Sequence, residues 1–127
     1  MNKLYLSAYL DGLLNMASSL SKSIGPSSVS VNCYDKKEFD KEYKIDYSPT
    51  SLSYEDKLKE WFVDEKKVVE SILYWTNRYI KDIKKIYIIN KKDLDLFKKD
   101  NPLYFIDDVF IIETKDYMIT FVLGNNE

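Results

Sequence analysis

The first apolar pattern along the chain has the period of an α-helix. Apolar residues recur at steps of three and four positions, namely at Leu6, Leu10, Leu13, Leu14, Ala17, Leu20 and Ile24. Because such steps place side chains on one face of a helix, the pattern predicts an amphipathic helix over residues 3–23, ended by Gly25 and Pro26. Tyr5 and Met16 lie off the stripe, which indicates that this helix is covered on more than one side.

Two shorter segments alternate apolar and polar residues, over positions 29–34 and again over positions 42–47. A period of two is typical of a β-strand with one buried side, so two strands are expected here. The charged segment DKKEFDK, residues 35–41, is expected to be the loop between them.

A long second helix is predicted to follow Ser53, which is suited to accept hydrogen bonds at a helix N-terminus, with Asp56 at the third helical position. Apolar residues then recur at helical spacing as far as Ile83, and only Glu65 and Thr76 interrupt the stripe. Acidic residues in the first turn and lysines in the last match the sign of the helix dipole.

The remaining residues predict a strand over 86–89, a short helix ended by Asn101-Pro102, and a hairpin over 109–122 that turns at Lys115-Asp116. The order is therefore α-β-β-α-β-(short α)-β-β. This order is typical of a single α+β domain, residues 1–127, with a mainly antiparallel sheet of about five strands packed against two helices.

The hairpin is apolar on both sides. A two-residue turn pairs Thr114 with Tyr117, Ile112 with Ile119 and Phe110 with Phe121 on one side, which we expect the helices to cover. The opposite side, called the hairpin surface below, carries Val109, Ile111, Glu113, Met118, Thr120 and Val122. It is either an open interface, or it is covered within the monomer by the first helix or a loop. On the first reading, a charge placed at Ile111 or Val122 changes association and leaves the fold intact.

Composition narrows the class of protein. With 45% hydrophobic and 31% charged residues, the 127-residue chain has the composition of a single folded domain. The net charge of −2 gives no field that attracts nucleic acid, and no run of about 18 to 20 apolar residues predicts a membrane span. Asp11 interrupts the apolar N-terminal run, unlike a signal peptide, and a single cysteine suits a reducing compartment. We therefore expect a cytoplasmic protein that binds neither nucleic acid nor membrane.

The sequence offers little for catalysis. It contains no histidine, which removes the usual general base near neutral pH and most zinc sites. The single cysteine, Cys33, lies on the apolar side of a strand and is expected to be core. Four acids could bind magnesium only if the fold brings them together, namely Asp93, Asp95, Asp107 and Asp108. Neither a metal nor another cofactor is expected.

Charge and tyrosine content point instead to binding. Residues 81–99 hold seven Lys against three Asp, and residues 100–127 hold six acids against one Lys. Such a run is usually a solvated face, but its acidic part could also steer a basic partner. The chain also has 11 Tyr, a residue favoured at interfaces because its ring buries area while its hydroxyl finds a partner.

No motif identifies a family. By architecture alone the order of elements resembles some small bacterial immunity proteins, which neutralise a toxin, although a fold does not fix a function. We expect a noncatalytic protein-binding module, either an antitoxin or immunity factor or a phage-borne inhibitor of a host defence protein. The alternatives are a self-associating assembly protein, which includes a homodimer, and an acid-dependent metal hydrolase.

Overall fold

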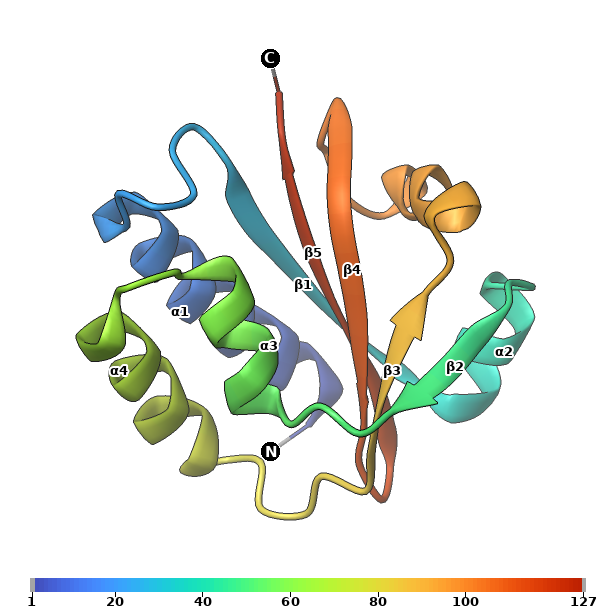
Figure 1. Cartoon of the computed structure of the whole chain (residues 1–127). Helices are drawn as coiled ribbons and strands as arrows, with labels where there is room; N and C mark the ends of the chain where they lie inside the picture. The colour runs from blue at the N-terminus through green and yellow to red at the C-terminus, as the bar shows by residue number, and fades with distance from the viewer. Residues whose placement is uncertain (1, 127) are drawn as a thin grey trace.

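The computed structural model describes residues 2–126, and within that range it contains five helices and five strands (Figure 1). In chain order the elements are α1 (Lys3–Leu20), β1 (Ser28–Asp35), α2 (Lys36–Glu42), β2 (Tyr47–Thr50), α3 (Tyr54–Trp61), α4 (Lys66–Asn77), β3 (Lys85–Ile89), the 3-10 helix η1 (Lys91–Lys99), β4 (Phe105–Glu113) and β5 (Tyr117–Asn125). The strands form one antiparallel sheet in the order β1-β5-β4-β3-β2. The predicted α+β fold with five strands is confirmed.

The hairpin formed by β4 and β5 has the predicted register. Thr114 donates its backbone N–H to the carbonyl oxygen of Tyr117 at 2.9 Å, so the turn lies at Lys115-Asp116. The other predicted pairs are all present, namely Phe110 with Phe121, Ile112 with Ile119, Val109 with Val122, Ile111 with Thr120 and Glu113 with Met118. The hairpin occupies the centre of the sheet, between β1 and β3.

The two early strands differ from the prediction. The strand expected over 42–47 lies instead at Tyr47–Thr50, and β1 and β2 are not neighbours but form opposite edges of the sheet. Most of the segment expected to be their loop is the helix α2, whose Phe39 side chain is fully buried. One apolar residue among six charged ones is enough to hold this short helix against the sheet.

The long second helix is two helices. Ser53 and Asp56 form the predicted reciprocal N-terminal hydrogen bonds, at 3.1 Å and 2.9 Å. However, α3 ends at Trp61, and the connection to α4 contains Asp64 with a positive φ of 59°, which no helix allows. The chain can therefore fold α4 back beside both α1 and α3.

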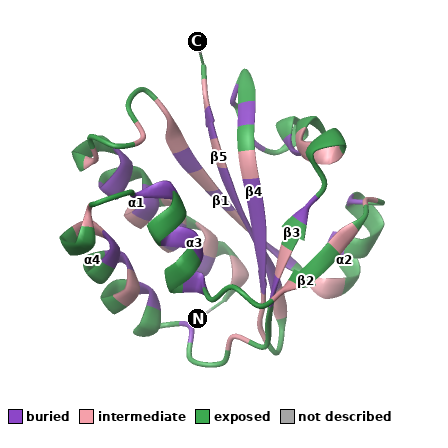
Figure 2. Cartoon of the chain, in the orientation of Figure 1, coloured by how far each residue is buried: buried purple, intermediate pink, exposed green. Residues whose placement is uncertain are grey.

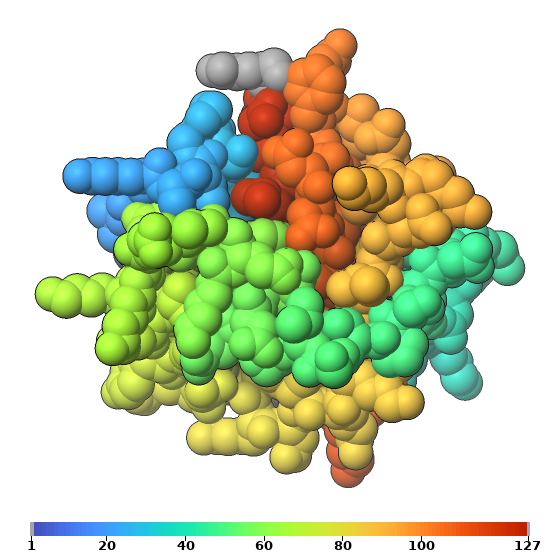
Figure 3. Space-filling view, in the orientation of Figure 1, coloured from blue at the N-terminus to red at the C-terminus, as the bar shows by residue number. Residues whose placement is uncertain are grey.

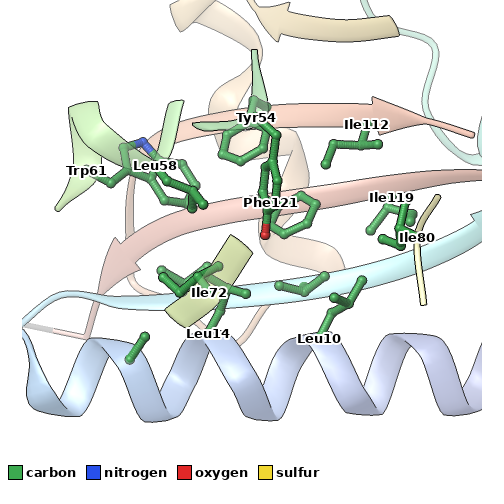
Figure 4. Packing of buried hydrophobic residues seen from close by; sticks show 14 of the residues in the cluster. Leu10, Leu14, Tyr54, Leu58, Trp61, Ile72, Ile80, Ile112, Ile119 and Phe121 are labelled. Carbon is green, nitrogen blue, oxygen red and sulfur yellow. The ribbon is translucent and has the colours of Figure 1, made fainter. Parts of the chain in front are cut away.

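Helices cover both sides of the sheet. In Figure 1, α1, α3 and α4 lie to the left of the strands, and α2 and η1 lie to the right. The first group buries Phe110, Ile112, Ile119 and Phe121, as predicted, together with Leu10, Leu14 and Ile72 (Figure 4). Figure 2 shows the result as long buried runs along β4 and β5, the strands sandwiched between the two groups.

The outer edge of β1 is closed by α1. The backbone N–H of Val31 donates to the carboxylate of Asp11 at 2.8 Å, and the hydroxyl of Ser7 donates to the carbonyl oxygen of Val31 at 3.4 Å. This contact explains why a charge interrupts the apolar N-terminal run. α1 packs against both β1 and α4, but the residues on which the predicted second covered side rested, Tyr5 and Met16, are themselves exposed. A third side of α1 remains exposed.

Candidate functional site

The hairpin surface is not an open interface, so this prediction is wrong. Five of its members have side chains buried within the chain itself, namely Val109, Ile111, Met118, Thr120 and Val122. The sixth, Glu113, is half-buried and accepts hydrogen bonds from Lys36 at 3.0 Å and from the hydroxyl of Tyr87 at 2.6 Å. The four apolar members, Val109, Ile111, Met118 and Val122, belong to a second hydrophobic core and are closed to a partner.

The cover over the hairpin surface consists of aromatic rings from two short elements. Phe39 of α2 and Phe97 of η1 are both fully buried. The ring of Tyr43 stacks on each of them, with centroids 5.2 Å from Phe39 and 4.6 Å from Phe97. Because α1 packs on the opposite side of the sheet, neither the first helix nor an irregular loop supplies the main cover.

A carboxylate closes this second core on its solvent side. One oxygen of Asp100 accepts hydrogen bonds of 2.7 Å from the hydroxyls of both Tyr34 and Tyr43. Burial, followed by these polar contacts, raises the pKa of Tyr34. These hydrogen bonds link Tyr34 of β1, Tyr43 after α2 and Asp100 at the end of η1. Their role is therefore to hold these elements together.

The four candidate metal ligands do not converge. Asp93 and Asp95 lie in η1, whereas Asp107 and Asp108 lie in β4. Asp108 instead accepts hydrogen bonds from Lys57 at 3.1 Å and from the indole of Trp61 at 2.8 Å. Between residues 2 and 126 no group of three or more histidine, cysteine or acidic side chains is placed to hold a metal ion.

Cys33 is placed as the sequence predicts. Its side chain is buried in the first core, and burial raises the pKa of its thiol to about 12. A thiol with such a pKa is almost entirely protonated near neutral pH, and the thiolate is the reactive form. The arrangement gives Cys33 no nucleophilic character.

The acids of residues 100–126 are only partly satisfied by internal contacts. Asp108 pairs with Lys57 and Glu113 with Lys36, and Asp100 accepts hydrogen bonds from two neutral tyrosine hydroxyls. Asp107 and Asp116 are exposed, so negative charge remains at the surface of this segment.

A cluster of exposed aromatic residues lies at the C-terminal end of α4. We call the set Tyr74, Trp75, Arg78 and Tyr79 the α4 cluster. The rings of Tyr74 and Trp75 meet edge to face with centroids 5.1 Å apart, and the guanidinium of Arg78 lies 5.6 Å from the Trp75 ring. Even so, Trp75 remains 45% and Tyr74 59% exposed. About half of each side chain is therefore accessible to solvent.

The cluster is held rigidly by the opposite side of α4. Ile72 and Thr76 are fully buried there, and the Thr76 hydroxyl is hydrogen bonded to that of Tyr54 at 3.0 Å. From α1, the hydroxyl of Tyr9 donates to the carbonyl oxygen of Trp75 at 2.9 Å, and its ring packs at 4.5 Å on that of Tyr79. The exposed rings therefore project from a helix that is anchored on both α1 and α3.

Hollows flank α4 on both sides. Toward α1 an apolar groove of about 340 Å³ is lined by Leu13, Met16, Ala17, Leu20, Lys67, Val68, Ser71, Ile72 and Trp75. Toward α3 a hollow of about 680 Å³ mixes Val63 and Leu73 with acids and lysines. Figure 3 shows α3 and α4, in green to yellow-green, covering much of the sheet on this face. The α4 helix is thus a ridge that carries exposed aromatic side chains.

Sequence reasoning missed this site although its residues are conspicuous in the segment LYWTNRY, residues 73–79. The chain's two tryptophans are 14 positions apart, and both were consistent with a single long helix. Trp61 lies on the predicted apolar stripe and is buried, whereas Trp75 lies outside the stripe that Ile72 and Thr76 continue and is exposed. The available signal was the adjacent aromatic pair Tyr74-Trp75 followed closely by the chain's single arginine.

Comparison with protein-family models, with curated proteins and with solved structures gives no match. No helix in the described range is long and apolar enough to cross a membrane.

Proposed function

We propose that this protein is a noncatalytic protein-binding module of the inhibitor or immunity type, and that the α4 cluster is its binding site. The observation that carries the proposal is the exposed contact of Trp75 with Tyr74 and Arg78. Tryptophan, tyrosine and arginine are the three residue types most enriched among side chains that dominate binding energy at interfaces. Arg78 is also the only arginine in the chain.

The rigidity of the cluster supports this function. Ordering a flexible side chain at an interface costs about 0.5 to 1.5 kcal/mol, and rings already fixed by packing avoid much of that cost. Tyr79 is fixed by Tyr9, and the backbone of Trp75 by the Tyr9 hydroxyl. The cluster is therefore preorganised for a rigid partner surface.

The chemistry of the site also describes the partner. Trp75 and Tyr74 require an apolar pocket, whereas Arg78 and the exposed Lys81 favour carboxylates at its rim. We infer a partner with an apolar pocket bordered by acidic groups, such as a toxin or defence protein whose working surface the module occupies. The cytoplasm is the compartment in which we place this encounter, since the chain relies on no disulfide.

The test is a comparative capture from lysate of the source organism. The baits are the wild-type chain, a Trp75→Ala/Arg78→Glu double variant and an Asn77→Ala control on the same helix. A protein retained by wild type and control but lost with the double variant is then purified. Calorimetry should show binding that the double variant weakens at least 100-fold, which corresponds to about 2.8 kcal/mol.

Inhibition is tested on that purified partner. Its own activity should fall when the wild-type module is added and recover with the double variant. If all three baits retain the same proteins, or the partner binds the double variant with wild-type affinity, the α4 cluster is not the binding site.

A further inference from the structure

The outward side of α1 is apolar and carries no charge. Its four large side chains are 66% to 77% exposed, namely Leu4, Tyr5, Met16 and Leu20. The other exposed residues of this side are Ala8, Gly12, Asn15 and Ser19. Together these eight residues form what we call the outer face of α1. An exposed helix face of this length without an acidic or basic residue is unusual in a chain with 31% charged residues.

The two charged residues of α1 are both directed elsewhere. Asp11 accepts a hydrogen bond from Val31, and Lys3 forms ion pairs with Asp35 at 3.3 Å and with Glu38 at 3.0 Å. The neutrality of the outer face therefore persists in the folded protein.

Gly12 lies at the centre of the outer face. Successive helical residues are about 100° apart around the helix axis. By that rule the other seven residues of the outer face lie almost evenly to either side of Gly12. A Cβ atom added at Gly12 would meet nothing within 4 Å. Glycine destabilises a helix interior relative to alanine, so the fold of the monomer gives no reason for a glycine at this position. A glycine at such a position does permit another backbone to approach closely.

We propose that a second copy of this chain docks on the outer face, with the two α1 helices packed antiparallel across a two-fold axis at Gly12. In that arrangement the half of α1 that carries Tyr5 and Ala8 meets the partner's half that carries Met16 and Ser19. Tyr5 then lies opposite Ser19 and Met16 opposite Ala8, large against small on both sides of the axis, and Leu4 meets Leu20 at each end of the interface.

The absence of charge favours an identical partner. Two copies meeting across a two-fold axis bring like surfaces together, so any cluster of one sign would repel itself. The outer face has no such cluster, and it offers no charge that a partner of opposite sign could recognise.

The area of the outer face sets the expected affinity of the dimer. A helix of 18 residues is about 27 Å long and about 11 Å across, so its outward half offers on the order of 500 Å². A pair of helices would then bury on the order of 1,000 Å², which is near the lower limit for a specific interface. We therefore expect a reversible dimer with a Kd of roughly 1 to 100 µM.

This dimer does not rest on the proposed function. It is centred on Gly12 of α1, whereas the partner site is centred on Tyr74, Trp75 and Arg78 of α4; the two surfaces adjoin at the groove that Met16 and Leu20 share with Trp75. Variants of Gly12 leave the α4 cluster unchanged, so the two proposals can fail separately.

The first test measures the dimer in solution. Sedimentation equilibrium of the wild-type chain should show monomer and dimer in exchange over the micromolar range. Gly12→Glu places two like charges at the axis and should weaken the dimer at least tenfold. At a concentration where both chains are monomeric it should not lower the melting temperature, because the position is exposed in the monomer. The control Asn77→Glu adds the same charge on exposed α4 and should leave the dimer intact. A wild-type chain that stays monomeric up to about 1 mM, or a Gly12→Glu variant that dimerises as well as the control, would overturn the proposal.

The second test measures orientation by disulfide cross-linking. Helices 8 to 10 Å apart place facing Cα atoms within about 5 Å, which is inside the range for a disulfide. Gly12→Cys should therefore cross-link to itself, and Ala8→Cys should cross-link to Met16→Cys in a mixture. Two copies of Ala8→Cys should not cross-link, because antiparallel packing separates them by about 12 Å. The native Cys33 is buried and does not compete. Efficient self-cross-linking of Ala8→Cys, with none between Ala8→Cys and Met16→Cys, would overturn the antiparallel arrangement.

Discussion

The carboxylate of Glu65 accepts hydrogen bonds from both the hydroxyl and the backbone N–H of Ser23, the latter at 3.2 Å. It also accepts from the hydroxyl of Ser21 and from the backbone N–H of Lys22 at 3.1 Å. Glu65 immediately precedes α4, and the serines follow α1, so one side chain joins two helices. The two hydroxyls, and then the backbone groups, lower the pKa of Glu65 from its ordinary value of 4.5 to about 2.

Replacing Glu65 should change how stability depends on pH. A pKa that is lower in the folded state means that the carboxylate contributes stability above about pH 4.5, and that this contribution is lost as the pH falls toward 2. Glu65→Gln should melt at a lower temperature than wild type at pH 7, with the difference shrinking at pH 2 to 3. Thermal melts across this range measure the effect. Glu70→Gln, at an exposed position of α4, is the control and should follow wild type; parallel curves for wild type and Glu65→Gln would contradict the assignment.

Removing the carboxylate of Asp108 should destabilise the fold. The Lys57 side chain is only 5% exposed, and Asp108 accepts hydrogen bonds from it and from Trp61. Asp108→Ala leaves the buried ammonium without that partner, and since the Asp108 side chain is 35% exposed we expect a loss of about 2 kcal/mol rather than the larger values of fully buried pairs. Urea unfolding measures this loss in the free energy of unfolding. The neighbouring exposed Asp107→Ala should change the free energy of unfolding by less than about 0.5 kcal/mol; equal losses in both variants would refute the role given to Asp108.

A charge in the hairpin surface should unfold the protein. The sequence alone suggested that Ile111→Lys would alter association and leave the fold intact. Ile111 is fully buried beneath α2 and η1, so an unpaired ammonium there should cost more than about 4 kcal/mol. Circular dichroism and solubility report the outcome. Lys115→Glu, in the exposed turn of the same hairpin, should fold normally. A soluble Ile111→Lys variant with a wild-type melting temperature would show that the second core is open in solution.

Two glycines should respond to alanine in opposite directions. Nothing lies within 4 Å of a Cβ at Gly12, so Gly12→Ala should stabilise the monomer by about 0.5 to 1 kcal/mol. At Gly124 an added Cβ would collide with the backbone oxygen of Phe105 in the neighbouring strand, so Gly124→Ala should be destabilising. Melting temperatures measured at a concentration where the chain is monomeric show whether each substitution stabilises or destabilises the fold. A destabilised Gly12→Ala monomer would mean that this part of α1 is not exposed.

The parts of the fold that the sequence predicted are those set by local periodicity. The register of β4 and β5 follows from a two-residue turn and alternation, and the start of α3 follows from Ser53 and Asp56. Even the two polar residues that interrupt the long apolar stripe proved meaningful, because Glu65 bonds to the end of α1 and Thr76 bonds to Tyr54.

The parts that the sequence did not predict depend on single residues or on distant contacts. α2, which the sequence predicted as a loop, is buried through Phe39, and one ring in a charged stretch gives no periodic signal. The short helix before Asn101-Pro102 was predicted and is η1, but its packing over the hairpin through Phe97 was not. The break after Trp61 preserves helical spacing closely enough that α3 and α4 resemble one helix. Because the cover of the hairpin surface follows from these features, the sequence left open a surface that the fold buries.

The pairing of β1 with β5 determines how the chain must fold. Each residue of β1 faces a partner in β5 that lies between 82 and 96 positions later in the chain, from Asp35 opposite Tyr117 to Ser28 opposite Gly124. Closing a loop of that length costs chain entropy before any contact repays it, whereas β4 and β5 can pair across two residues. We therefore expect the hairpin to form early and β1, with α1 attached to its edge, to join late. Folding should be slow for a domain of this size, in milliseconds to seconds, and until β1 arrives one edge of β5 remains open to pairing with other chains.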